Sequence, residues 1–208
     1  MSDITISSLA RISREALAEQ LLATPISQTT TPNPSSSTST TPTGTSSSTC
    51  AQSPPGSSTT PAPSIAIVDV RDGDHIGGHI RGSTWVPSSE LDFRTPQLVR
   101  DLQDKDVVVF HCALSQQRGP SAALRYLREK RRLDGEGSVS ISGGVVKEGF
   151  EKVDGEGKEG LAEGEGKGKK KVQKVLVLEG GFTKWQEAYG SDERLTEGWQ
   201  KDIWEWGN

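Results

Sequence analysis

Short apolar runs alternate with helical patterns along most of the chain. Three runs are almost entirely apolar: residues 64–70 (SIAIVDV), 106–110 (DVVVF) and 175–178 (VLVL). Apolar strands that alternate with helices are typical of a parallel sheet covered by helices on both faces. The pattern therefore predicts an α/β fold.

Helical periodicity appears in four segments, in which apolar residues recur every three or four positions. The expected helices are one capped by Ser13 with Leu17, Leu21 and Leu22 on one face, one from Arg118 with Ala123, Leu124 and Leu127, one opened after Gly181 that contains Trp185, and a C-terminal one with Leu195, Trp199, Ile203 and Trp206.

Two tracts of biased composition interrupt this pattern. Residues 24–64 contain no charged or aromatic side chain and hold eight of the eleven prolines, and residues 134–171 hold eleven of the 23 glycines. Such tracts bury too little apolar area to offset the entropy of ordering them. We expect a lead-in helix in residues 1–23, a disordered insert in 24–63, and one folded domain in 64–208 with a flexible loop at about 134–171.

Composition and charge narrow the function classes. The formal net charge is −4 and the pI is near 5.5, so no electrostatic footprint for nucleic acid is expected. No apolar run reaches the roughly 18 residues of a membrane span. One of the two cysteines, Cys50, lies in the Pro-rich tract, so a structural disulfide is not expected. Unpaired cysteines favour a reducing compartment, and we expect a cytoplasmic or nuclear protein.

The stretch with the clearest chemistry is residues 107–120, VVVFHCALSQQRGP. It places Cys112 just after a predicted strand and Arg118 at the start of a predicted helix. A strand-to-helix loop can turn its backbone N–H groups into an anion cradle, and the helix N-terminus adds partial positive charge. Arg118 can grip two oxygens of a tetrahedral anion, and the same field favours the Cys112 thiolate. The spacing predicts a nucleophile beside a bound oxyanion, poised to form a covalent intermediate.

The other residues of this stretch have less defined roles. A lone Cys at a strand end is usually a small packed residue, so the prediction depends on the Cys–Arg pair. His111 either tunes the thiolate or, as we prefer, supports the loop, and Ser115 either aids the leaving thiolate or braces the backbone. Neither a second nearby Cys nor paired His residues offer metal-ligand spacing, so no metal is expected. The oxyanion-binding loop is predicted to comprise Ala113, Leu114, Ser115, Gln116, Gln117 and Arg118.

Four stretches resemble a known family: residues 67–71 (IVDVR), 77–82 (GGHIRG), 111–120 (HCALSQQRGP) and 177–182 (VLEGGF) with Trp185. They are similar to the rhodanese-fold phosphatases that activate cyclin-dependent kinases (the M-phase inducer type) and to the eukaryotic arsenate reductases. The resemblance spans residues 65–189 apart from the charged insert. It implies a rhodanese-like three-layer domain with a central, mostly parallel sheet, and supporting roles for Asp69, Arg71 and Gly119.

The loop also shows where the chain follows that family and where it departs. Sulfurtransferases of this fold typically have a six-residue loop, whereas Cys112 to Arg118 makes seven, as in the phosphatases. The cell-cycle phosphatases commonly carry acidic residues in this loop, where this chain has Ala113 and Gln117. A leaving-group proton would then come from the substrate or from an acid such as Asp72 or Asp74. His75 and His79 are interpreted as packing or turn residues.

The predicted function is a cysteine-dependent protein tyrosine or dual-specificity phosphatase that acts through a phosphocysteine intermediate. An arsenate reductase that uses an external thiol such as glutathione is the alternative. A non-catalytic partner-binding module and a thiosulfate sulfurtransferase are disfavoured by the intact Cys–Arg pair and by the loop length. The expected partner is a phosphoprotein or a small oxyanion, without a bound cofactor, and the oligomeric state is left open.

Overall fold

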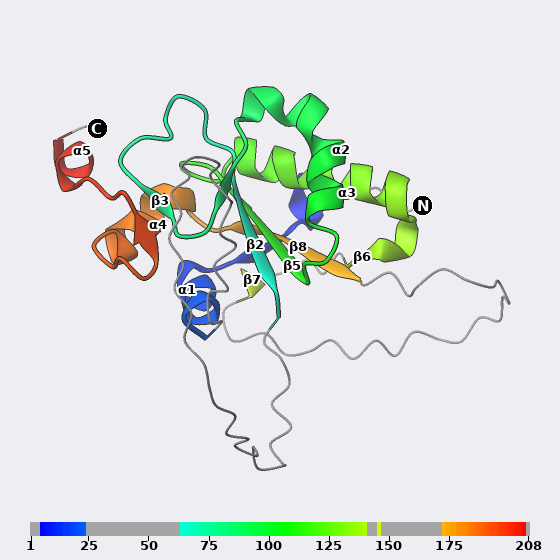
Figure 1. The fold of residues 1–208 in the computed structure, drawn as a ribbon, viewed down its shortest axis with the longest axis horizontal. Helices are drawn as coiled ribbons and strands as arrows, with labels where there is room; N and C mark the ends of the chain where they lie inside the picture. Colours follow the sequence, from blue (N-terminus) through cyan, green and yellow to red (C-terminus); the bar gives the residue numbers. More distant parts are fainter. Residues whose placement is uncertain (1–4, 24–62, 141–144, 147–171, 207–208) are drawn as a thin grey trace, which may run out of the picture.

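A central parallel sheet with helices on both faces organises the protein (Figure 1). A computed structural model describes residues 5–23, 63–140, 145–146 and 172–206. The main sheet has the strand order β4-β2-β5-β8-β1-β7, and β6 also pairs with β8. Each of its pairings is parallel. The predicted α/β class with a mostly parallel sheet is confirmed.

The strands of both sheets are short. The main sheet contains β1 (Ala10–Ile12), β2 (Ile65–Asp69), β4 (Thr84–Trp85), β5 (Val107–His111), β6 (Val139–Ser140), β7 (Val145–Val146) and β8 (Gln173–Leu178). A separate antiparallel pair joins β3 (His79–Ile80) to β9 (Thr196–Glu197). The helices are α1 (Arg14–Ala23), α2 (Leu91–Asp101), α3 (Arg118–Asp134), α4 (Gly181–Tyr189) and α5 (Lys201–Trp206), with 3-10 turns η1 (Ile6–Ser8), η2 (Ser88–Glu90) and η3 (Glu136–Ser138).

The two faces of β5 show why the domain has three layers. All five β5 residues are buried, and successive side chains point to opposite faces of the sheet. Val108 and Phe110 pack in one apolar cluster with residues of α2 and α3. Val107 and Val109 pack in a second cluster with residues of α1 and α4. A strand covered on both faces presents no position to solvent, which explains the continuous apolar run before His111.

Helix α1 confirms its predicted cap and corrects its predicted face. The Oγ atom of Ser13 accepts a hydrogen bond of 3.2 Å from the amide of Ala16. Leu17 is fully buried and Leu21 is half-buried, but Leu22 is 50% exposed. Residues 17 and 21 are one turn apart, whereas residue 22 lies about 100° further round the helix.

Several elements differ from the sequence prediction. The expected C-terminal helix that would contain Leu195 and Trp199 is wrong, because Thr196–Glu197 pairs with β3 and Gly198 has φ +63°, so α5 begins only at Lys201. Helix α2, with Pro96 inside it, and the three-residue β1 were not predicted. The region 134–171, expected to be a loop throughout, contributes β6 and β7 to the sheet.

The remaining predicted inserts lie outside the described residues. This applies to the Ser/Thr/Pro-rich tract except for residue 63, and to positions 141–144 and 147–171 of the Gly-rich tract. Within the described part of the chain, no helix combines the length and apolarity needed to cross a membrane.

Candidate active site

The two motif segments meet at one edge of the sheet. Strands β2 and β5 are parallel neighbours, and their register places Asp69 opposite His111, at the carboxyl end of each strand. The segments that follow, residues 70–74 and 112–118, therefore leave the sheet side by side. In α/β sheets this carboxyl edge is the usual location of ligand sites.

The loop after β5 folds around the sulfur of Cys112. Ser115 has φ +52°, a left-handed conformation that non-glycine residues rarely adopt. In this conformation the Ser115 amide donates a hydrogen bond of 3.2 Å to the Sγ atom of Cys112. The Ser115 hydroxyl accepts a 3.5 Å hydrogen bond from the Cys112 amide. This contact favours a role for the hydroxyl in bracing the backbone over a role in assisting the leaving thiolate. Cys112 itself is 3% exposed.

Two backbone hydrogen bonds join the start of α4 to the loop. The amide of Phe182 donates to the carbonyl oxygen of Cys112, and the amide of Thr183 donates to that of Ala113, each at 2.9 Å. In a trans peptide the N–H group points opposite to the C=O group. The N–H groups of Ala113 and Leu114 consequently point away from α4.

The remaining loop amides are suited to bind an anion. Leu114, Gln116 and Gln117 are exposed, and the loop leads directly into the N-terminus of α3, which carries partial positive charge. Several loop amides make no hydrogen bond to any described residue, namely those of Ala113, Leu114, Gln116 and Gln117. These donors and the helix end lie in the segment for which the sequence predicts oxyanion binding.

A glycine pair that opens α4 permits this packing, and its role was not predicted. Gly181 has φ +61°, and a Cβ atom there would lie 2.3 Å from the Ala113 carbonyl oxygen and 2.5 Å from that of Cys112. Any side chain at this position would push α4 away from the loop. The sequence signal for this contact was the double glycine in residues 177–182, whose importance only the family resemblance indicated.

Beneath the loop lies a buried ion pair between Asp69 and Arg71. Arg71 donates to the Asp69 carboxylate from Nε at 2.9 Å and from Nη2 at 2.7 Å, and both side chains are fully buried. Burial alone would raise the pKa of Asp69, but His111 and Arg71 outweigh burial and lower it. The Arg71 guanidinium also lies 4.2 Å from the ring centroid of Phe182, at the start of α4. The supporting roles implied for Asp69 and Arg71 have this physical basis.

His111 is neutral in this environment. Its ring is fully buried, which lowers its pKa to about 4, although the Asp69 carboxylate 3.8 Å from Nε2 acts in the opposite direction. Neither ring nitrogen has a hydrogen-bond partner among the described residues. A neutral imidazole supplies no positive charge to a thiolate, so the geometry favours the structural role for His111 over the tuning role.

The two other histidines lie in packing positions. The ring of His75 stacks on Trp85 with centroids 4.8 Å apart, and its Nε2 atom lies 3.4 Å from the Asp69 carboxylate. His79 pairs with Glu197 at 3.2 Å across the β3–β9 ladder. Both contacts agree with the interpretation of these histidines as packing or turn residues. Among the described residues, no group of three or more His, Cys, Asp and Glu side chains is arranged to hold a metal ion.

Arg118 pairs with two carboxylates from the segment after β2. Its Nη1 atom donates to Asp72 at 3.1 Å and to Asp74 at 2.7 Å, and its Nη2 atom donates to the second oxygen of Asp74. The hydrogen bond from Arg118 lowers the pKa of Asp74 to about 2. The pKa of Asp72 is lowered mainly by the hydroxyl of Ser88. Both carboxyl groups are ionised near neutral pH, which disfavours either one as a proton donor in the free protein.

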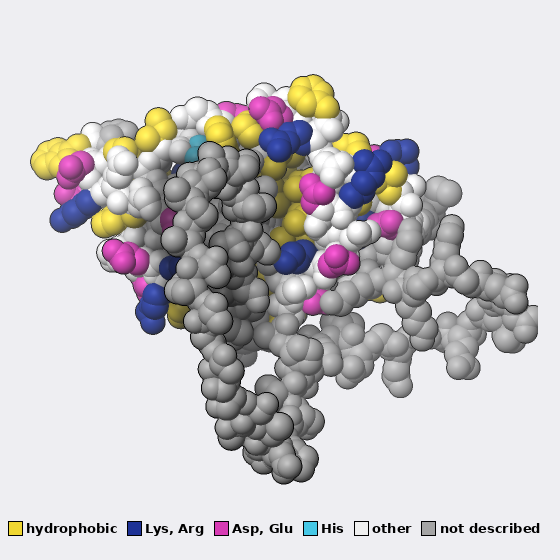
Figure 2. Space-filling view, viewed as in Figure 1, with side chains coloured by type: hydrophobic (Ala, Val, Ile, Leu, Met, Phe, Trp, Pro, Cys, Tyr) yellow, Lys and Arg dark blue, Asp and Glu magenta, His cyan; other side chains and the backbone are white. Residues whose placement is uncertain are grey.

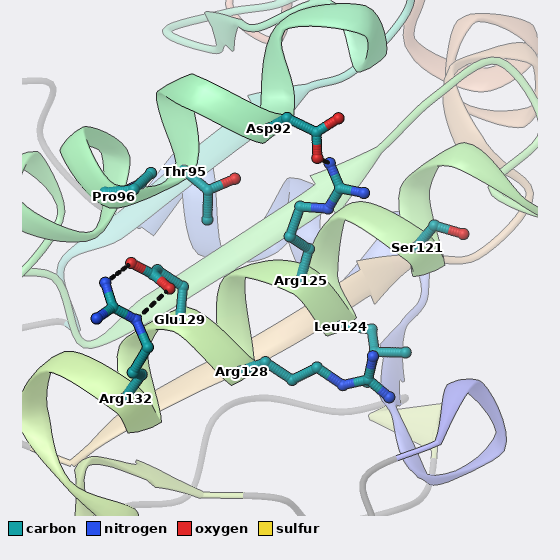
Figure 3. Close-up of a pocket in the computed structure, with 9 residues that line it drawn as sticks. All are labelled: Asp92, Thr95, Pro96, Ser121, Leu124, Arg125, Arg128, Glu129 and Arg132. Atoms are coloured by element: carbon teal, nitrogen blue, oxygen red, sulfur yellow. Dashed lines mark hydrogen bonds and ion pairs between the residues drawn. The ribbon is translucent and has the colours of Figure 1, made fainter.

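A groove between α2 and α3 lies beside this site (Figure 3). It encloses about 500 Å³, and Ser121, one turn beyond Arg118, lies at one end of it. Ion pairs from Arg125 to Asp92 and from Arg132 to Glu129 cross or line the groove. Basic and acidic side chains are interspersed on the surface over these helices (Figure 2). Neither Cys112 nor Arg118 lines the groove, so it is separate from the loop that follows β5.

Comparisons with known proteins agree with this fold. Residues 58–188 match the family model described as a rhodanese-like domain. The chain is 32% identical to the CDC25-like phosphatase YCH1 of Saccharomyces cerevisiae, over 72% of this chain and 84% of that protein. It is 43% identical to arsenate reductase 2.1 of Oryza sativa over 38% of this chain and 52% of that protein. A solved structure of Ygr203w, a yeast protein tyrosine phosphatase of the rhodanese family, covers 97% of this chain and 99% of its own with 24% identity and a TM-score of 0.53, which supports the fold.

Proposed function

Because the chain belongs to the rhodanese-like family, in the group that includes the Cdc25-like phosphatases, we propose that it is a cysteine-dependent phosphatase. The substrate class is a phosphoprotein, or a small aryl phosphate in the assay. The observation that supports the proposal most directly is the Ser115 amide held 3.2 Å from the Cys112 sulfur, in a loop whose other amides are free to bind an oxyanion.

The reaction has two steps on the same sulfur. The Cys112 thiolate attacks phosphorus in line, so that an S–P bond forms as the P–O bond to the leaving group breaks. Loop amides and Arg118 hold the nonbridging oxygens and stabilise the charge that develops on them. Water then attacks phosphorus, the S–P bond breaks, and inorganic phosphate leaves the restored thiolate. The Ser115 amide stabilises the sulfur anion in both steps.

The leaving group takes its proton from the substrate. The loop offers no acid, and the two nearby carboxyl groups, Asp72 and Asp74, are ionised because of Ser88 and Arg118. A phosphate monoanion carries a transferable proton of its own. The enzyme should consequently prefer leaving groups with low pKa values, such as phenols, over alkyl alcohols.

Hydrolysis of an aryl phosphate tests the proposal. We expect Cys112→Ser to abolish turnover, and Arg118→Lys to reduce it strongly because lysine keeps the charge but loses the planar fork. Cys50→Ser is the matched control and should retain wild-type activity. A folded wild type without turnover, or a Cys112→Ser variant that still turns over, would overturn the proposal.

Arsenate reduction is a second candidate, supported by the similarity to arsenate reductase 2.1 and by the uncharged Ala113 and Gln117 in the loop. The thiolate would displace water from arsenate to form an S–As(V) adduct. A glutathione thiol would attack the Cys112 sulfur, releasing As(III) as arsenite and leaving a mixed disulfide, and a second glutathione would restore the thiol and yield oxidised glutathione. Thiol-dependent arsenite release, assayed on the same sample, decides this candidate.

A further inference from the structure

The bonding of Arg118 leaves one edge of its guanidinium group unused. A guanidinium has five N–H donors in a fixed plane. Asp74 takes one donor from Nη1 and one from Nη2, which together form the end-on edge, and Asp72 takes the second donor of Nη1. Nε–H and the second N–H of Nη2 make no hydrogen bond to any described residue, and these two donors lie parallel along the side-on edge. That edge has the bidentate geometry that suits two oxygens of a tetrahedral anion.

The two carboxylates are themselves held in place. Asp72 accepts a 2.6 Å hydrogen bond from the Ser88 hydroxyl and a 3.3 Å hydrogen bond from the Ser89 amide. One carboxylate oxygen of Asp74 accepts a 2.9 Å hydrogen bond from the Asp72 amide. The turn after β2 and the 3-10 turn η2 thus form a rigid support for the guanidinium group. A long arginine side chain anchored in this way loses less rotamer freedom when it grips an anion.

We propose that Asp74, with Asp72, is a positioning residue that holds the end-on edge of Arg118 and so directs its side-on fork to the substrate oxyanion. This inference rests on the proposed oxyanion-dependent reaction and deepens it. Asp74 acts through Arg118 and does not touch the substrate. Its negative charge opposes anion binding, but it lies on the edge of the guanidinium that the anion does not use.

Direct oxyanion binding tests the positioning role without turnover. Tungstate, a tetrahedral anion that the enzyme cannot hydrolyse, is titrated calorimetrically into Cys112→Ser and into the same variant with Asp74→Asn. We expect Asp74→Asn to weaken tungstate binding about tenfold, because a freely rotating guanidinium must be ordered on binding. The matched control is Asp192→Asn, which breaks an exposed Asp–Arg pair with Arg194 and should leave the dissociation constant unchanged. Unchanged or tighter binding in Asp74→Asn overturns the proposal, and tighter binding would identify the carboxylate as a competitor of the anion.

Kinetics with an intact Cys112 separate positioning from proton donation. Asp74→Asn should raise KM for an aryl phosphate about tenfold and leave kcat within about threefold, and Asp74→Glu should recover part of the lost affinity. A large fall in kcat with loss of one limb of the pH profile would make Asp74 the proton donor and overturn the positioning role.

If wild type hydrolyses nothing but tungstate binding still weakens in Asp74→Asn, the proposed function fails and the positioning role stands. If hydrolysis depends on Cys112 but Asp74→Asn changes neither kcat nor KM, the proposed function stands and the positioning role fails.

Discussion

The amide of Phe182 donates a 2.9 Å hydrogen bond to the carbonyl oxygen of Cys112, so the start of α4 is tied to the residue that we propose as the nucleophile. Residue 182 follows β8 and residue 112 follows β5, and these strands are parallel neighbours in the sheet. The contact fixes the peptide plane after Cys112 and thereby the direction of the next N–H group. The orientation of the anion cradle is decided by a segment distant in sequence.

Gly181→Ala should disrupt this contact. Its Cβ would lie 2.3 Å from the Ala113 carbonyl oxygen, in a left-handed backbone region that alanine disfavours. We expect the unfolding free energy to fall by about 2 to 4 kcal/mol and the activity of the remaining folded protein to fall as well. Urea unfolding and kcat/KM for an aryl phosphate measure the two effects. Gly137→Ala, where a Cβ meets nothing within 4 Å, is the control and should change neither.

Substitutions of Ser115 separate its backbone conformation from its hydroxyl group. Its φ of +52° costs a non-glycine residue about 1 to 2 kcal/mol, whereas glycine adopts it freely. Both Ser115→Gly and Ser115→Ala lose the acceptor for the Cys112 amide, so Ser115→Gly should be the more stable and the more active of the two. Thermal unfolding and aryl phosphate kinetics of the pair provide the comparison. A more active Ser115→Ala variant would show that the left-handed conformation of residue 115 does not limit activity.

Stability should depend on pH through His111. Its pKa is about 4 in the folded protein and near 6.5 when unfolded, so between these values the unfolded chain binds the additional proton. The unfolding free energy should therefore fall as pH is lowered from about 6.5 to 4, by about 3 kcal/mol at most from this residue. Denaturant unfolding across this range should show a smaller slope in His111→Asn than in wild type.

Other ionisable groups at the same sheet edge titrate in ways that can be distinguished. His75 also has a lowered pKa, owing to burial, and adds a contribution of the same sign. The pKa values of Asp69 and Asp74 are lowered, so their stabilising contributions are present above about 3.8 and are lost only below it. An equal slope in wild type and His111→Asn between pH 6.5 and 4 would contradict the assignment to His111.

A buried polar link between α3 and β8 gives a prediction about stability alone. The Tyr126 hydroxyl donates to the side-chain oxygen of Gln173 at 2.7 Å, and the Gln173 amide nitrogen donates to the carbonyl oxygens of Leu102 and Lys105. Tyr126→Phe leaves one buried acceptor unpaired and should cost about 1 to 2 kcal/mol. Gln173→Ala leaves the Tyr126 hydroxyl and the Lys105 carbonyl unpaired and removes one of the two hydrogen bonds to the Leu102 carbonyl, so it should cost more. Urea unfolding measures the unfolding free energy of both variants. A larger loss in Tyr126→Phe than in Gln173→Ala would contradict this account.

The α/β class and the strand-to-helix junction that holds Cys112 and Arg118 could be predicted because they depend on local patterns. Continuous apolar runs reveal strands buried on both faces, and Cys112 and Arg118 are only six positions apart at a strand-to-helix junction. The short β1, Pro-containing α2 and the β3–β9 pair were missed because elements of two or three residues, and a helix with an internal proline, carry little periodicity. Their stability comes from neighbours distant in the chain.

The parallel sheet and the spacing of Cys112 and Arg118 follow from residue order alone. How the two side chains are oriented depends on contacts between distant segments. The tertiary structure brings Asp74 against Arg118 and α4 against the Cys112 carbonyl, and it buries His111 in neutral form. Each of these contacts joins segments that leave different strands at the same sheet edge. The order and register of the strands set how close these segments lie, and neither is encoded in any local pattern.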